Sequence, residues 1–117
     1  FDEELDSRNQ VDAFYRQYLN NAQYHPKDYQ SAHALFSITL GSEKKRAELI
    51  DKLKKNNIPN VIYYKYPIHL MKGFHYLGYK NGDFPVSEKL SKSIVSLPMH
   101  PYLKKAEINF IIQSIVS

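Results

Sequence analysis

Only two stretches of this chain have the residue pattern of a β-strand, and this shortage limits the folds open to it. Residues 33–40 alternate between two faces, and residues 61–66 are β-branched and aromatic; both patterns favour strands. Two strands joined by a helix do not make a stable sheet by themselves. We therefore expect at least one further strand, for which residues 93–97 and 29–32 are the candidates.

Four other stretches repeat apolar residues at helical spacing. They are residues 2–20, residues 43–56, a segment that begins near Pro85 and runs toward residue 97, and a final segment around residues 108–115. Each forms one apolar stripe, as expected for a helix that packs on a core. Few strands with several helices predict a small α+β fold, in which an antiparallel or mixed sheet is packed on one side by helices.

Size and composition point to one folded domain over residues 1–117, since 43% of the residues are hydrophobic and no linker divides the chain. The absence of cysteine excludes a disulfide framework, a thiolate metal site and a cysteine nucleophile, and it fits a cytoplasmic protein. No apolar run approaches the roughly 20 residues that span a bilayer. The chain starts at Phe1 without an initiator methionine, so we expect it to be part of a longer protein.

The net charge of +4 raises the question of an anionic partner. The lysines stand next to acids, as in residues 43–46 and 51–55, which is the pattern of a solvated helix face rather than of a nucleic-acid site. Ten tyrosines could stack on bases. A stand-alone binding module for a nucleotide or nucleic acid, or a bare structural or dimerisation domain, therefore remains an alternative.

His69 stands out among the five histidines because it follows Pro67 at the exit from the predicted strand 61–66. Loops at strand ends often carry binding residues, and an imidazole can donate to a substrate oxygen near pH 7. The alternative is a loop histidine that is hydrogen-bonded to local backbone. No histidine pair has metal-ligand spacing, and neither a Gly-x-Ser-x-Gly nor a Gly-rich phosphate loop occurs.

The order of these segments resembles the C-terminal small domain of the DegT/DnrJ/StrS family of pyridoxal-phosphate (PLP)-dependent sugar-nucleotide aminotransferases. The resemblance extends over nearly the whole chain and rests on these segments: residues 31–38, 46–53, 57–59, 62–70, 77–79, 82–88 and 97–103. Three positions depart from the family pattern, since His33 stands where a large aromatic residue is usual, Leu35 where glutamine is common, and Lys65 where the first proline of the loop is expected.

The resemblance implies a parent enzyme that moves an amino group, with glutamate as donor, to a keto-sugar nucleotide. Residues 1–28 would form a helix that joins an absent N-terminal large domain to the small α+β domain of residues 29–117. PLP would be the parent's cofactor, held by the large domain and not by this chain, which alone would be inactive. We also expect a homodimeric parent, and neither nucleic acid nor a membrane as partner.

By position in the family pattern, His69 is the residue expected to reach the sugar or the cofactor. The other residues that we expect to contact substrate are neighbours in the same segment: Tyr64, Lys65 and Tyr66. No catalytic or metal-binding residue is expected in this chain.

Overall fold

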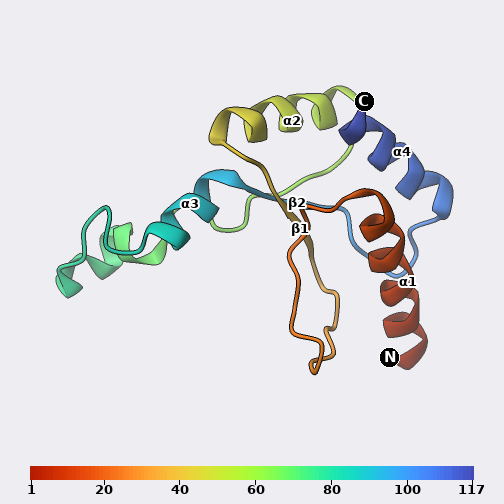
Figure 1. The fold of residues 1–117 in the computed structure, drawn as a ribbon, viewed down its shortest axis with the longest axis horizontal. Helices are drawn as coiled ribbons and strands as arrows, with labels where there is room; N and C mark the ends of the chain where they lie inside the picture. Colours follow the sequence, from red (N-terminus) through yellow and green to blue (C-terminus); the bar gives the residue numbers. More distant parts are fainter.

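The structure is a computed structural model that describes all 117 residues, and Figure 1 shows its arrangement. Its elements are α1 (Asp2–Tyr18), β1 (Phe36–Thr39), α2 (Glu43–Lys55), the 3-10 helices η1 (Ile68–Leu70) and η2 (Lys72–Leu77), α3 (Pro85–Ser93), β2 (Ile94–Leu97) and α4 (Lys105–Val116). The helices predicted from the 2–20 and 43–56 patterns are confirmed to within two residues at each end. The final apolar stripe is also confirmed, as α4.

Strands β1 and β2 pair antiparallel as a two-stranded sheet with two unlike faces. Phe36 lies opposite Leu97, and Ile38 lies opposite Val95; all four side chains are buried. Because side chains alternate along a strand, the other face carries the intervening residues. The core cluster joins the apolar face of the sheet to α1, α2 and α4. The predicted α+β fold, with helices on one side of a small sheet, is therefore confirmed.

Tyr15 anchors α1 to the sheet. Its side chain is fully buried, and its ring stacks on Phe36 with the ring centroids 4.5 Å apart. Its hydroxyl donates to the carbonyl oxygen of Pro98 at 2.9 Å, so the one polar atom of the ring is satisfied. Burial raises the pKa of Tyr15 above its ordinary value. Helix α1 thus contributes to the core of the chain, and its role as a connection to another domain stays a prediction.

The strand predicted at residues 61–66 is wrong. Only Val61 pairs with the sheet, through a single antiparallel bridge to Ser96 in which the two backbone hydrogen bonds measure 3.1 and 2.9 Å. The chain then leaves the sheet edge, and Tyr64 and Tyr66 are exposed. A run of β-branched and aromatic residues has the same composition whether it belongs to a sheet or packs on another surface. In this structure no strand lies beyond β2 to extend the sheet.

Of the two candidates for a further strand, residues 94–97 form β2 and residues 29–32 lie outside every strand. The sheet therefore has two strands, and the expectation of a third is wrong. The helix that begins at Pro85 therefore ends at Ser93, earlier than its apolar repeat suggests. Arg46 of α2 helps to end it, since the buried guanidinium donates from Nη1 to the carbonyl oxygen of Ser91 at 2.6 Å. A cation at this position satisfies a free carbonyl and interacts favourably with the negative end of the helix dipole.

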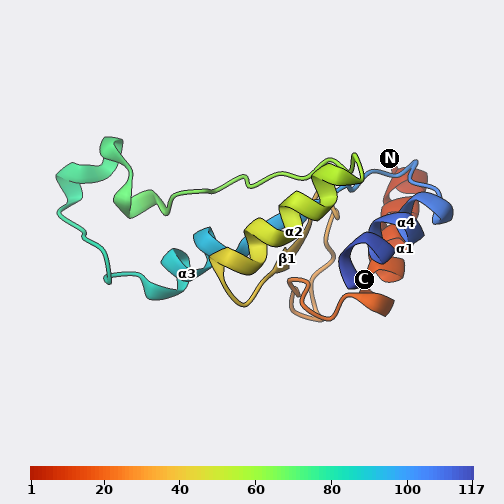
Figure 2. The ribbon, with the colours of Figure 1, turned by 90° about the horizontal axis from the view of Figure 1, so that it is seen from above.

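The molecule is far from spherical. Its extents are 47 × 35 × 22 Å and its radius of gyration is 15.9 Å, whereas a compact domain of this length has a radius of about 13 Å. The accessible surface is 8443 Å², against about 6,600 Å² expected from the mass of the chain. Figure 2 shows the cause, because the segment between η1 and α3 extends far from the helices that cover the sheet. None of the helices has both the length and the apolar character needed to cross a membrane.

Candidate functional site

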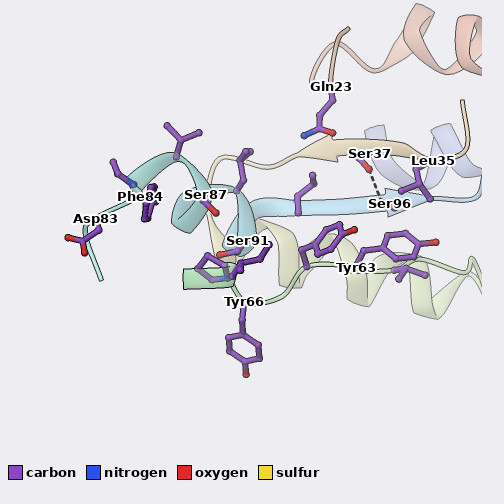
Figure 3. A pocket seen from close by; sticks show the side chains of 18 residues that line it. Gln23, Leu35, Ser37, Tyr63, Tyr66, Asp83, Phe84, Ser87, Ser91 and Ser96 are labelled. Carbon is purple, nitrogen blue, oxygen red and sulfur yellow. Dashed lines mark hydrogen bonds between the residues drawn. The ribbon is translucent and has the colours of Figure 1, made fainter. Parts of the chain in front are cut away.

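A groove of about 800 Å³ lies on the face of the sheet opposite to the helix-covered core (Figure 3). Its floor includes Ser37 of β1 and Ser96 of β2, whose hydroxyl oxygens are 2.7 Å apart and hydrogen-bonded. Its wall on one side is formed by apolar residues of α3, such as Val86 and Leu90. The groove therefore exists because the sheet has helices on one side only.

Three tyrosines from the segment after Val61 also line the groove: Tyr63, Tyr64 and Tyr66. Tyr64 is 69% exposed and Tyr66 61% exposed, although each is large enough to bury well over 100 Å². The polar groups inside the groove are few, among them Gln23 and the serine pair. An apolar concavity with few polar groups is the usual form of a site for a flat or partly apolar ligand, or for another protein segment.

A smaller cavity of about 270 Å³ lies on the other side of the same segment, between it and helices α2 and α3. Lys65, Lys92 and Arg46 line it, together with Glu43 and Glu88. Arg46 already donates to backbone carbonyls of the α3–β2 junction, so Lys65 and Lys92 are the cations available to a solute. The sequence predicted Lys65 as a site residue; Lys92 and Arg46 were missed because they come from elements remote in sequence.

His69 lies outside both cavities, at the base of the extended segment. Its side chain is 7% exposed, and Nε2 is 2.8 Å from Oε1 of Glu88 on α3. The same oxygen accepts a hydrogen bond from the backbone N–H of Gly82 at 2.8 Å. Phe84 closes the group, with its ring edge-on to the imidazole at 4.8 Å between centroids. The imidazole is therefore held by a side chain, and not by the local backbone.

Glu88 is the residue of this site that the sequence reasoning missed. The hydrogen bond from His69 is the largest of several effects that lower the pKa of the Glu88 carboxyl, and the bond from Gly82 adds to it. The available signal was the Phe-Pro-Val-Ser-Glu motif that ends at this residue. Nothing in a single sequence links it to a histidine 19 positions earlier.

The predicted site residues therefore fall into three places. Tyr64 and Tyr66 line the groove, Lys65 lines the smaller cavity with its Nζ 5.9 Å from the Tyr66 ring centroid, and His69 is bound to Glu88. No contact here tests whether any of them touches a substrate, so that role stays a prediction.

The chain provides neither an activated lysine, which PLP needs for a Schiff base, nor a set of metal ligands. Every lysine of the chain is exposed, whereas a lysine that forms a Schiff base is activated by desolvation or by a neighbouring cation. No group of three histidine, aspartate or glutamate side chains is arranged to hold a metal ion. The residues present do not fit PLP, and no chemical step is assigned to them through it.

Solved structures share this architecture. A DegT DnrJ EryC1 StrS aminotransferase from Brucella abortus is 36% identical with a TM-score of 0.82, over 96% of this chain and 30% of that one. DesV from S. venezuelae is 22% identical with a TM-score of 0.89, over 97% of this chain and 31% of that one, and supports the fold alone. The fold is that of one part of an aminotransferase-fold protein.

The sequence comparisons give the family. The profile of the DegT/DnrJ/EryC1/StrS aminotransferase family matches residues 1–116. The dTDP-3-amino-3,4,6-trideoxy-alpha-D-glucose transaminase of Micromonospora megalomicea subsp. nigra is 39% identical over 70 residues, which are 59% of this chain and 19% of that protein. A pleiotropic regulatory protein of Geobacillus stearothermophilus is 37% identical over 90 residues, 77% of this chain and 24% of that protein. The chain belongs to the DegT/DnrJ/EryC1/StrS aminotransferase family and spans between a fifth and a quarter of the length of these two curated relatives.

Proposed function

We propose that this chain is the C-terminal small domain of an enzyme that transfers an amino group from glutamate to a keto-sugar nucleotide by means of PLP. The observation that carries the proposal is the family match over residues 1–116 together with the small share of each relative that the chain covers. In the parent, PLP would act as electron sink while the protein supplies binding and orientation. Residues outside this chain would hold it, because all lysines here are exposed.

The part that this chain plays in the parent is contact with the sugar nucleotide. Tyr64 and Tyr66 offer exposed aromatic faces in the groove, on which a base or a sugar ring can stack. Lys65 lines the neighbouring cavity and can attract the diphosphate as a point charge. His69 can bond a sugar hydroxyl through the ring nitrogen that Glu88 does not occupy.

The test begins with the parent reading frame, because the proposal requires a longer protein. The purified full-length protein should show the absorbance of bound PLP and should form 2-oxoglutarate when it is given glutamate and a keto-sugar nucleotide. The 117-residue chain alone should show neither. A full-length protein with PLP bound but no amino transfer to any sugar nucleotide tested would contradict the proposal.

A second candidate is a stand-alone nucleotide-binding module, which the tyrosine-lined groove of about 800 Å³ favours. In that case the isolated chain would bind a nucleotide by itself, with an affinity that falls when Tyr64 and Tyr66 are replaced by serine. Under the aminotransferase proposal, the isolated chain binds nucleotide only weakly, since most of the site lies on residues outside it. Calorimetric titration of the chain with UDP and dTDP separates the two candidates.

A further inference from the structure

The segment of residues 70–82, which we name the arm, is held to the rest of the molecule only near its ends. None of its residues is buried, and residues 72–82 are all exposed. Its backbone hydrogen bonds are local turns, such as Phe74 N–H to Met71 oxygen and Gly78 N–H to His75 oxygen. A segment without buried contacts has little stability of its own and opens easily. Its position must therefore be set where it joins the domain.

Glu88 makes the contacts at that junction. Its Oε1 accepts from the residue that precedes the arm, His69, and from the residue that ends it, Gly82, each at 2.8 Å. One carboxylate oxygen on α3 thus bonds both ends of the arm. The side chains of Glu88 and His69 are 13% and 7% exposed, so the bond between them is partly shielded from competing water, whereas the bond from Gly82 lies at the surface.

The same contact fixes the chemistry of the imidazole. A carboxylate can only accept hydrogen bonds, so the Nε2 that faces Glu88 carries the proton. In the neutral ring, Nδ1 is then the acceptor, and it has no partner within the chain. It is not among the buried unpaired nitrogens either, which are Nε of Arg8 and Nη1 of Arg16. Nδ1 of His69 therefore has a free lone pair and some contact with solvent, although the side chain as a whole is only 7% exposed.

We propose that Glu88 is a positioning residue: it bonds both ends of the arm and holds His69 with Nδ1 presented as a hydrogen-bond acceptor for a hydroxyl of the sugar nucleotide. The substrate part of this inference rests on the function proposed above, and the structural part does not. Two experiments on the full-length protein test the two parts separately.

The first experiment measures opening of the arm by trypsin, which can cut after the exposed Lys72 and Lys80. Glu88→Ala should raise cleavage at both sites about tenfold or more, because the hydrogen bonds to His69 and to Gly82 are both lost. Glu88→Gln keeps an acceptor oxygen and should stay within about threefold of wild type. Glu48→Ala removes an exposed carboxylate of α2 that has no hydrogen bond or ion pair in the structure, and it should cleave as wild type.

Two variants of His69 separate its two nitrogens. His69→Gln can still donate to Glu88 from a position like Nε2 but loses the Nδ1 acceptor, whereas His69→Asn is too short to reach Glu88. We expect the arm of His69→Gln to stay protected from trypsin and the arm of His69→Asn to become about tenfold more sensitive. This pair decides the structural part even if Glu88→Ala does not fold. Equal protection of both variants would overturn it.

The second experiment measures kinetics with the sugar nucleotide. We expect His69→Gln to lower kcat/KM at least tenfold despite its protected arm, because an acceptor for the substrate is lost. Glu88→Ala should lower kcat/KM mainly by raising KM, and it should have no further effect when His69 is already alanine. Independent, additive losses would show that Glu88 does not act through His69. A wild-type protein without transaminase activity would refute the proposed function, while the trypsin results would still decide the arm.

Discussion

At the scale of single residues, two buried polar side chains pair with backbone groups of distant elements. The Tyr15 hydroxyl meets the carbonyl of Pro98, and the Arg46 guanidinium meets the carbonyls of Ser91 and Ile94. In each case a side chain satisfies a backbone group that secondary structure leaves free. Such pairs fix one arrangement of the helices on the sheet.

Tyr15→Phe tests the first of these pairs. The variant keeps the stacking on Phe36 but leaves the Pro98 carbonyl unpaired, so we expect a loss of about 1–2 kcal/mol in the free energy of unfolding at neutral pH. Burial raises the pKa of Tyr15 above the ordinary value of about 10. Because the pKa of Tyr15 is higher in the folded than in the unfolded chain, its contribution to the free energy of unfolding is complete below pH ~10 and is lost as the pH rises above that value. Urea unfolding at pH 7 and at pH 11 should show the difference between wild type and variant shrinking at the higher pH.

The stability that Glu88 contributes depends on pH in the opposite direction. Its carboxyl pKa is lowered, first by the hydrogen bond from His69, so its contribution is complete above the ordinary pKa of about 4.3 and is lost as the pH falls below that value. Carboxyl-carbon NMR should give Glu88 a lower pKa than the exposed Glu48 in the same sample. His69→Asn should move the Glu88 value upward. Identical titration of the two glutamates would contradict the pairing that the structure shows.

At the scale of elements, the junction of α3 and β2 is the part of the fold that the apolar repeat could not place. Residues Val86, Leu90 and Ile94 recur at helical spacing, yet the helix ends at Ser93 and Ile94 begins the strand. The strand forms because β1 offers free hydrogen-bonding groups beside it, and because Arg46 satisfies the carbonyl of Ser91. Tertiary contacts outweigh the local repeat here.

Arg46→Met tests this junction. The variant keeps most of the apolar stem of the side chain but leaves the Ser91 carbonyl without its charged donor, so we expect a loss of about 1.5–3 kcal/mol in the free energy of unfolding. Lys44→Met, an exposed neighbour on α2, is the matched control and should change stability by less than about 0.5 kcal/mol. Hydrogen exchange should show faster exchange of the α3 amides in Arg46→Met only. Equal stability of the two variants would mean that Arg46 does not end α3.

At the scale of the whole molecule, the surface is larger than a chain of this size needs. The excess of roughly 1,800 Å² over a compact domain is more than the ~800 Å² that each partner buries in a protein–protein interface of standard size. Part of it is the groove, with its exposed Tyr64 and Tyr66. An exposed apolar groove normally contacts something else in the working protein, in agreement with a chain that spans 30% of the Brucella structure.

The isolated 117-residue chain should therefore self-associate. Sedimentation velocity should show oligomers that grow with concentration, since the groove is uncovered in the isolated chain. Replacing Tyr64 and Tyr66 by serine should shift the distribution toward monomer, while the same change at Tyr24 and Tyr29, which are 74% and 69% exposed but lie outside the groove, should not. A strictly monomeric chain at high concentration would show that the groove does not mediate self-association.

The sequence by itself determined α1, α2, α4, the first strand, the one-sided packing of the sheet and the family. Apolar spacing is a local property that each helix carries with it, and the family resemblance is carried by motifs spread along the chain. Only the tertiary structure decided that residues 62–66 leave the sheet and that their tyrosines line a groove. It also decided that residues 94–97 become β2 and that His69 is bound to Glu88. Each of these depends on which surface lies opposite a residue, and that surface comes from a part of the chain too distant for local pattern to reveal.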